Sequence, residues 1–339
     1  MDDAPKAILI VGPAWVGDMV MAQSLFKFVK SRHPDAAIDV IAPAWSRSLL
    51  ERMPEVREAL SLPFGHGDFK LLARMRLGAS LKNRRYDWAI VMPITWKSAL
   101  VPYGAKILRR SGYIGEMRWG LLNDLRTMDK AERPMMVQRY IDLALNRNEP
   151  APDSFPYPQL VVDASTRDRA ISDLKLDTSL GPIIAFCPGA EYGPAKRWPS
   201  AYFNKVAEEY INKGWQVWIF GSGKERALGE EIRDKLDSTK IRNLAGETSL
   251  AQAIDLLSVA DAVLSNDSGL MHVAAALDRK VYALYGSSDT RYTPPLNDSA
   301  QCISLNLVCS PCFKRECPLG HTNCLMELTP EKVLAEMAL

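Results

Sequence analysis

Residues 7–32 read AILIVGPAWVGDMVMAQSLFKFVKSR, and they indicate the fold class. Ala7–Val11 is a β-branched apolar run that is typical of a buried parallel strand. A loop with two glycines, Gly12 and Gly17, follows, and a helical pattern then runs from about residue 19 to 32. A strand that passes through a glycine loop into a helix predicts the start of a βαβ unit, and so an α/β fold.

The same alternation continues along the whole chain. Further strands are expected at Ile38–Ala42, Ala59–Leu62, Trp88–Val91, Ile183–Cys187, Gln216–Phe220, Ala262–Ser265 and Val281–Leu284. Further helices are expected near residues 46–53, 69–83, 201–213, 225–236, 250–259 and 269–277.

A proline-rich segment divides this pattern into two halves. Residues 149–158 read EPAPDSFPYP, and their four prolines exclude a regular helix. We therefore predict two Rossmann-like, doubly wound parallel-sheet domains that face a cleft, at residues 1–158 and 159–339. The last helix is expected in the second domain, with packing back on the first as an alternative.

Composition and charge limit the class of protein. The 339 residues suit two domains, and 47% hydrophobic and 24% charged residues are typical of a globular protein. No apolar run approaches the roughly 20 residues of a membrane-spanning helix, and the acidic start is unlike a signal peptide, so we expect a cytoplasmic protein. Residues 1–163 carry a net charge of +5 and residues 164–339 of −3. The first half is thus expected to meet an anionic partner, but the excess is too small for a dedicated nucleic-acid binder.

The loop after the first strand presents a carboxylate. In GPAWVGDM, the residue after Gly17 is Asp18, where a phosphate-binding loop has lysine. A carboxylate facing the cleft can act as general base on a sugar hydroxyl. The alternative is that Asp18 only caps the helix.

Two loops of the second half combine glycine with charge. PGAEYGPAKRWP, residues 188–199, brings Lys196 and Arg197 to the start of a helix, which suits a diphosphate. GSGKE, residues 221–225, follows a strand and places Glu225 where it can accept hydrogen bonds from ribose hydroxyls. An ordinary surface loop and a first-turn helix acid remain the structural alternatives.

Two further segments are read as strand ends that lead into helices. NLAGETS, residues 243–249, has a turn glycine, Gly246, next to which a base can stack, although the pattern is mostly structural. NDSGLMH, residues 266–272, opens a helix whose N–H groups and Ser268 hydroxyl suit a pyrophosphate. His272 lies four residues after Ser268 and so on the same helix face. The alternative is an N-cap at Asp267 or Ser268 and a packed histidine.

Five of the six cysteines lie between Cys302 and Cys324. Cys309, Cys312, Cys317 and Cys324, with His321 among them, have a spacing similar to that of metal ligands. A structural metal, free or redox-labile thiols, and disulfides remain open, and we assign no metal site and no catalytic role to them.

The motifs GPAWVGDM, PGAEYGPAKRWP, FGSGKE, NLAGET and NDSGLMHVAAAL together resemble the heptosyltransferase family, glycosyltransferase family 9 with a GT-B fold. APAWSRSLLERMPEV, KSALVPYGAKI, GEMRWGLLND and MMVQRYI resemble more narrowly the heptosyltransferase II branch of that family. The resemblance runs from Ala7 to about Pro295.

The resemblance implies an enzyme that transfers heptose from ADP-heptose, with inversion and without a required cofactor, to the first heptose of heptosyl-Kdo2-lipid A. It implies Asp18 as general base and Lys196 as the cation that stabilises the leaving diphosphate. It also implies donor binding by Gly17, Gly189, Ala190, Gly221, Ser222, Glu225, Gly246, Asp267, Ser268, Gly269, Leu270 and His272.

Basic residues of the first half suit such an acceptor, an anionic glycolipid at the cytoplasmic face of the inner membrane. We expect peripheral membrane contact, and some of these cations to bind the acceptor or the bilayer: Lys70, Arg74, Arg76, Lys82, Arg84, Arg85, Arg109, Arg110 and Arg118. A solvated helix face is the structural alternative.

Three other functions compete with this one. They are heptosyltransferase I acting on Kdo2-lipid A, a sugar-nucleotide epimerase on the same fold, and a binding module built around the cysteines. A nicotinamide-dependent dehydrogenase is disfavoured, because the fingerprint G-x-G-x-x-G is missing.

Overall fold

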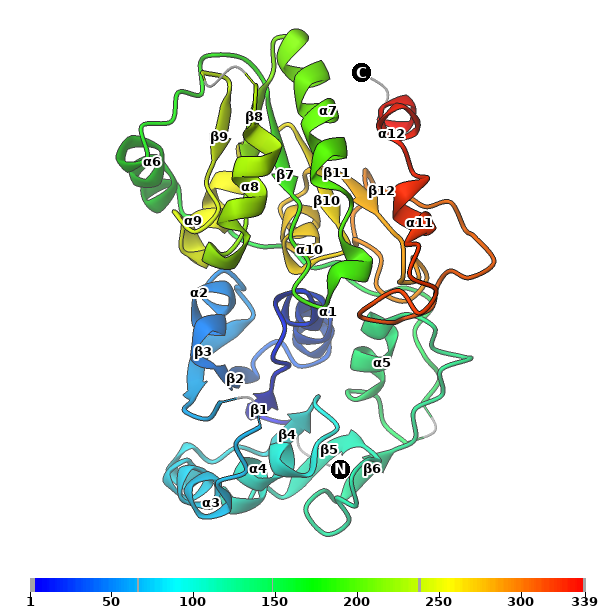
Figure 1. The fold of residues 1–339 in the computed structure, drawn as a ribbon. Helices are drawn as coiled ribbons and strands as arrows, with labels where there is room; N and C mark the ends of the chain where they lie inside the picture. The colour runs from blue at the N-terminus through cyan, green and yellow to red at the C-terminus, as the bar shows by residue number, and fades with distance from the viewer. Residues whose placement is uncertain (1–3, 66, 148, 237–238, 338–339) are drawn as a thin grey trace. The chain divides into compact units, whose positions relative to one another are not determined.

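The computed structural model describes residues 4–65, 67–147, 149–236 and 239–337. The chain divides into two compact units, Met1–Pro158 and Gln159–Leu339, and each contains one parallel sheet. Figure 1 labels the elements of both units. Among the described residues, no helix is long and apolar enough to cross a membrane.

The first unit is built on a sheet of order β3-β2-β1-β4-β5-β6. Its strands are β1 (Ala7–Val11), β2 (Ala37–Pro43), β3 (Val56–Leu62), β4 (Trp88–Val91), β5 (Arg109–Tyr113) and β6 (Asp124–Arg126). Its α-helices are α1 (Val16–Arg32), α2 (Arg47–Leu50), α3 (Leu71–Ser80), α4 (Leu100–Gly104) and α5 (Met136–Asp142).

The second unit repeats this topology with the order β12-β11-β10-β7-β8-β9. Its strands are β7 (Ile183–Cys187), β8 (Gln216–Ile219), β9 (Ile241–Asn243), β10 (Ala262–Asn266), β11 (Lys280–Leu284) and β12 (Gln301–Ile303). Its α-helices are α6 (Ala164–Asp173), α7 (Ser200–Asn212), α8 (Arg226–Arg233), α9 (Leu250–Leu257), α10 (Gly269–Ala276), α11 (Asn323–Met326) and α12 (Pro330–Glu336).

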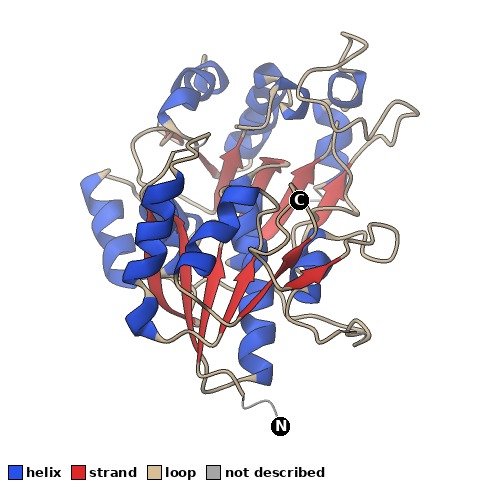
Figure 2. Cartoon of the chain, turned by 90° about the horizontal axis from the view of Figure 1, so that it is seen from below, coloured by secondary structure: helices blue, strands red, loops and turns tan. Residues whose placement is uncertain are grey.

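Both sheets therefore have the doubly wound Rossmann arrangement, and all their pairings are parallel. Figure 2 shows the strands running side by side with helices packed against them. In each unit the first strand lies beside the fourth, β1 beside β4 and β7 beside β10. The strand order reverses there, and ligands of open α/β sheets bind at the carboxyl ends of such strands.

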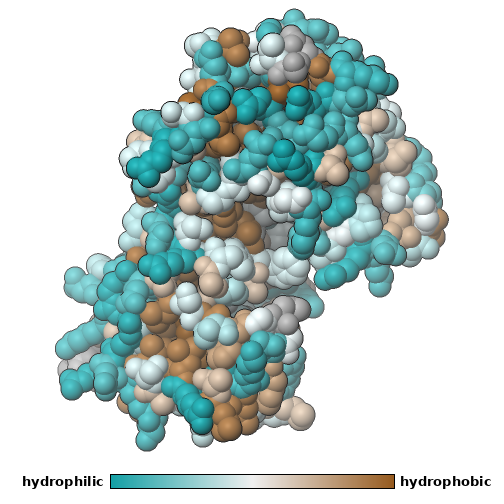
Figure 3. Space-filling model, turned by 60° about the vertical axis from the view of Figure 1, so that its left-hand side comes forward, coloured by the Kyte–Doolittle hydropathy of each residue, from teal (hydrophilic) through white to brown (hydrophobic). Residues whose placement is uncertain are grey.

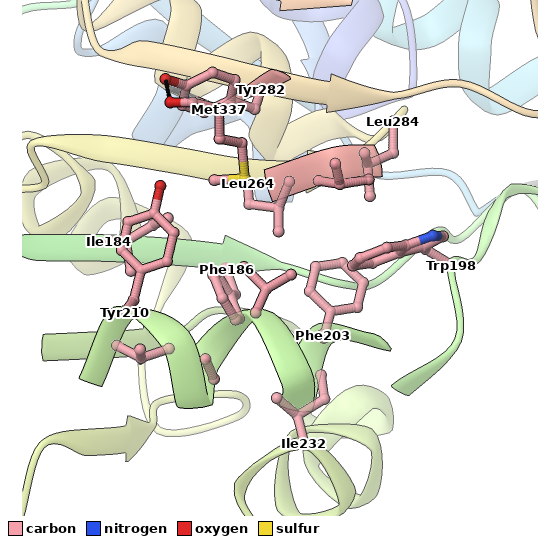
Figure 4. Close-up of a cluster of buried hydrophobic side chains, with 14 of the residues drawn as sticks. Ile184, Phe186, Trp198, Phe203, Tyr210, Ile232, Leu264, Tyr282, Leu284 and Met337 are labelled. Carbon is pink, nitrogen blue, oxygen red and sulfur yellow. Dashed lines mark hydrogen bonds between the residues drawn. The ribbon is translucent and has the colours of Figure 1, made fainter. Parts of the chain in front are cut away.

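Alternate side chains of the central strands form the core of the second unit. Ile184 and Phe186 of β7 point to the same side of the sheet and pack with Phe203 of α7. Figure 4 shows this cluster, and it includes the hydrogen bond that the Tyr282 hydroxyl donates to the Met337 carbonyl over 2.6 Å. That bond fixes the end of α12, which also packs against α7.

Four strands, β5, β6, β9 and β12, were not predicted because they lack a long apolar run. β5 contains arginines, serine and glycine because polar contacts replace apolar ones there: Arg109 stacks on the Trp88 ring at 4.2 Å, and the Ser111 hydroxyl donates to Asp124 over 2.6 Å. β6, β9 and β12 have only three residues each, too few for a recognisable pattern. The helix expected near residues 46–53 is a short 3-10 turn followed by α2.

Candidate functional site

One buried asparagine holds both ends of the loop after β7. Asn266, the last residue of β10, is fully buried. Its amide nitrogen donates to the Pro188 carbonyl over 2.6 Å, and its oxygen accepts from the Trp198 amide over 3.2 Å. The loop between these two residues carries Lys196 at the end of a 3-10 turn, Pro194–Lys196. Sequence reasoning did not single out Asn266, although it directly precedes Asp267.

Lys196 and Asp267 form an ion pair at the switch point of the second sheet. The ammonium of Lys196 donates to the carboxylate of Asp267, and their side chains are 17% and 5% exposed. Lys196 follows β7 and Asp267 follows β10, so the pair joins the two central strands at their carboxyl ends. The structure thus brings together a cation and an acid 71 residues apart in sequence.

His272 lies near enough to this pair to feel both of its charges, and it is uncharged at neutral pH. It sits in the first turns of α10 with 5% exposure. Burial lowers the pKa of His272 to about 4, and Lys196 lowers it further while Asp267 opposes the shift. A neutral imidazole can donate one hydrogen bond to a ligand without adding charge.

The start of α10 has free hydrogen-bonding capacity. Ser268 occupies the N-cap position, but its side chain makes no capping hydrogen bond. Its hydroxyl instead lies 3.2 Å from that of Ser265. Ser268 therefore holds the N-cap position without capping the helix through its side chain. Gly269 and Leu270 present first-turn N–H groups at the same end.

Glu225 explains two of the glycines. Its carboxylate accepts from the Ser222 amide over 2.7 Å and from the Ser222 hydroxyl over 3.0 Å, which is a capping box. A Cβ placed on Gly189 would lie 1.7 Å from one Glu225 carboxylate oxygen, and one on Gly221 would lie 2.9 Å from the other. Glu225 is thus a helix-start acid, as the structural alternative proposed, and it also lies against the loop that begins at Pro188.

We expect Gly189→Ala to damage this arrangement, because the new methyl overlaps the Glu225 carboxylate. The carboxylate must move and leave its capping bonds, which typically costs about 1 kcal/mol. The melting temperature should fall, which differential scanning calorimetry measures. Gly223→Ala is the matched control, since a Cβ there meets nothing within 4 Å.

Gly246 belongs to the same edge of the sheet. It has φ of +76°, and a Cβ there would lie 2.8 Å from the Cα of Gly223. Its amide donates to the Gly221 carbonyl over 3.0 Å. The turn after β9 therefore packs directly on the turn after β8, and only glycine fits that approach.

Asp18 lies in the first unit, three residues into helical structure. It is partly buried in the first turn of α1, which follows β1, and Gly17 precedes it there. The N-cap residue is Trp15, which makes no side-chain capping bond. The alternative of Asp18 as N-cap is therefore wrong in position, although its charge still suits the positive end of the helix dipole.

Most of the cations proposed for the acceptor have partners inside the first unit. Internal contacts hold Arg74, Arg84, Arg109, Arg110 and Arg118. Arg118 is 1% exposed and donates to the Pro93 carbonyl over 2.6 Å, and burial lowers its pKa to about 10. Arg84 pairs with Glu58 and with the buried Asp39. For Arg74 and Arg118, which are 3% and 1% exposed, a stabilising role inside the unit replaces the expected acceptor or bilayer contact.

Four cysteines line one small cavity of about 30 Å³, namely Cys309, Cys312, Cys317 and Cys324. None of the six cysteines forms a disulfide. Backbone amides, first that of Thr322, hydrogen bond to Cys317 and lower its pKa, whereas burial raises the pKa of Cys324. Across the described residues, no three His, Cys, Asp or Glu side chains are arranged to hold a metal ion. Metal analysis of the purified protein distinguishes a metal-bound loop from a thiol loop.

Two serines in the loop after β11 were not predicted as site residues from the sequence. The hydroxyls of Ser287 and Ser288 are buried and have no hydrogen-bond partner in the described structure. They lie in GSSDT, residues 286–290, in the loop that follows β11. Their position after a strand was the available signal, because hydroxyls there can bind a ligand.

Comparison with known proteins identifies the family. Residues 74–323 match glycosyltransferase family 9 (heptosyltransferase). Lipopolysaccharide heptosyltransferase 2 of Salmonella typhimurium is 48% identical over 338 residues, which cover 97% of each chain. The structure of Escherichia coli ADP-heptose lps heptosyltransferase II superposes with a TM-score of 0.88 and 45% identity, over 98% of this chain and 97% of the other.

A relative from the other branch is more distant. Lipopolysaccharide heptosyltransferase 1 of Pseudomonas aeruginosa is 26% identical over 198 residues, 54% of each chain. The likeness to the second branch covers nearly the whole chain, and the two parallel sheets agree with its GT-B fold. This chain belongs to glycosyltransferase family 9, the heptosyltransferases.

Proposed function

We propose that this enzyme transfers L-glycero-D-manno-heptose from ADP-heptose to the first heptose of heptosyl-Kdo2-lipid A. The observation that carries the proposal is the 48% identity over 97% of the chain to a heptosyltransferase 2, against 26% over 54% for a heptosyltransferase 1. Membership of a transferase family also favours transfer over epimerisation.

The site residues support a single inverting displacement. A hydroxyl oxygen of the acceptor bonds to the anomeric carbon, the bond from that carbon to the diphosphate breaks, and ADP leaves. Asp18 takes the proton of the attacking hydroxyl as general base. Lys196 and the start of α10 stabilise the negative charge that develops on the diphosphate. Fixed cations and N–H groups do this without a metal ion, so we propose that no cofactor is required.

The donor-binding residues follow the second sheet. We propose that Ser268, Gly269, Leu270 and His272 hold the phosphates, and that Asp267 belongs to this donor site by positioning Lys196. We propose that Gly189, Ala190, Gly221, Ser222, Glu225 and Gly246 hold the nucleoside. Most of them lie just after β7, β8, β9 or β10, where such sheets bind nucleotides. Gly17, beside Asp18, is proposed to approach the sugar from the first unit.

Acceptor choice is the decisive test of this proposal. ADP release from ADP-heptose is measured with heptosyl-Kdo2-lipid A or Kdo2-lipid A as acceptor, with and without EDTA. Release only with the heptosylated acceptor, unchanged by EDTA, is expected. Release with Kdo2-lipid A would make the enzyme a heptosyltransferase I, and loss of release with EDTA would refute metal-independent transfer.

We further propose that the first unit contacts the cytoplasmic face of the inner membrane. Lys82, Lys106 and Arg110 surround an open hollow of about 440 Å³ beside α3 and α4. Leu72 and Leu108 are 69% and 83% exposed near the same two helices. Figure 3 shows one side of the molecule, on which hydrophobic residues are bordered by hydrophilic ones. Exposed leucines beside cations are typical of surfaces that bind anionic bilayers.

Reversing two of these charges, in Lys82→Glu/Lys106→Glu, should weaken binding to anionic vesicles at least ~10-fold, since each cation contributes about 1 kcal/mol near such a surface. The KM should rise for acceptor in vesicles but not for a delipidated acceptor. Lys213→Glu/Lys332→Glu, with the same charge change on exposed residues of the second unit, is the control. Equal vesicle binding by both variants would refute this surface.

A further inference from the structure

The loop that carries the cysteines packs directly on the loop that carries Lys196. We call residues 309–324 the cysteine loop. The Ala195 amide donates to the Arg315 carbonyl over 3.0 Å, and the Tyr192 hydroxyl donates to the Phe313 carbonyl over 2.9 Å. A Cβ on Gly193 would lie 2.5 Å from the Arg315 carbonyl oxygen. The two backbones thus fit closely, and residue 193 must be glycine for them to do so.

This packing places a second cation at the same aromatic ring as Lys196. The guanidinium carbon of Arg315 lies 5.2 Å from the centre of the Tyr192 ring. The ammonium of Lys196 lies 5.1 Å from the same centre. One aromatic ring therefore holds two cations, each at a distance at which the ring attracts positive charge.

The charges around Lys196 leave a diphosphate without sufficient compensation. Lys196 is already paired with Asp267, so the two together carry no net charge. His272 is neutral, because burial holds its pKa far below 7. A diphosphate bound there brings at least two negative charges into a partly buried site, and such charges need paired cations.

Arg315 is available to supply the missing charge. Within the described part of the chain, no carboxylate lies within ion-pair distance of its guanidinium. Two other cations of these loops have partners of their own: the guanidinium of Arg197 donates to the Ala190 carbonyl over 3.3 Å, and the ammonium of Lys224 pairs with Glu191 at 3.2 Å.

We propose that Arg315 is a second diphosphate-binding residue of the donor site, presented to it by the cysteine loop. This rests on the proposed function and adds a binding residue to it. The guanidinium fork can donate two parallel hydrogen bonds to phosphate oxygens, and the contact with Tyr192 orders it before the nucleotide arrives. The cysteine loop thereby gains a role beside the site, since its fold determines where Arg315 lies.

The test is direct binding of ADP and ADP-heptose by calorimetry to wild type, Arg315→Gln and Arg315→Lys. Loss of hydrogen bonds to a charged group should weaken ADP binding of Arg315→Gln about 10-fold or more. Arg315→Lys keeps the charge without the fork, and its loss should be smaller. Lys314→Gln is the matched control, because it removes the same charge from the neighbouring exposed residue.

Each outcome has a distinct meaning. Normal ADP affinity of Arg315→Gln, or an equal loss in Lys314→Gln, overturns the inference. Melting temperatures equal to that of wild type exclude misfolding as the cause of a loss. Failure of the wild type itself to bind ADP would refute the proposed function, so the two failures are distinguishable. Adenosine, which has no phosphate, should bind Arg315→Gln within about 2-fold of wild type, because only the phosphate contact is lost.

Discussion

Asp18→Asn should lower kcat by ~10²–10⁴-fold while leaving ADP affinity nearly unchanged. Asparagine keeps the size and polarity of aspartate but cannot accept a proton at neutral pH. Because Asp18 lies in the first turn of α1 and not at its N-cap, loss of its charge should cost the helix less than about 1 kcal/mol. Steady-state ADP release with heptosyl-Kdo2-lipid A, together with calorimetric binding of ADP, measures both effects.

The pH dependence separates a base from a helix acid. An enzyme with a carboxylate base loses activity as falling pH protonates it, and Asp18→Asn should lack that acidic limb of the kcat/KM profile. Asp35→Asn removes an exposed carboxylate shortly after the end of the same helix and serves as control. A fully active Asp18→Asn variant, or an unchanged acidic limb, would return Asp18 to a role in helix stability alone.

The sequence predicts the central strands well because they are buried on both faces. Ala7–Val11, Trp88–Val91 and Ile183–Cys187 are observed with the predicted bounds, since a continuous apolar run is what two covering layers of helices require. The outer strands were missed because they lack such a continuous apolar run. β5 includes Arg109 and Arg110, whose aliphatic stems and hydrogen bonds replace apolar packing at the side of the sheet.

Some features of the site follow from local sequence motifs, and others depend on contacts between residues far apart in the sequence. Glycines and charges after strands marked the loops that hold Lys196, Glu225 and Asp267, because parallel topology places these loops at one edge. The Lys196–Asp267 pair and the closeness of Glu225 to Gly189 join residues 71 and 36 positions apart, and no local pattern contains that information. Charged residues are usually exposed, so the sequence suggested an exposed Arg118. The structure instead buries Arg118, which donates a hydrogen bond to the Pro93 carbonyl.

Lys196→Met should have two effects that can be measured separately. It removes a cation from the leaving diphosphate, and loss of one such preorganised donor typically lowers kcat ~10²–10³-fold. It also leaves the 5% exposed carboxylate of Asp267 without its partner. Breaking a buried pair in this way typically destabilises a protein by about 3–5 kcal/mol, so the melting temperature should fall clearly.

The double variant Lys196→Met/Asp267→Asn tells these effects apart. Asparagine removes the unpaired buried charge, so stability should return towards wild type, because losing both partners costs less than losing one. Catalysis should not return, since the diphosphate still lacks its cation. Lys205→Met is the matched control: Lys205 pairs with Glu208 on the surface at 3.3 Å, and its loss should change stability by less than about 1 kcal/mol. A stable and active double variant would mean that Lys196 serves only to neutralise Asp267, and the charge on the leaving diphosphate would then fall to other groups, with Arg315 first among them.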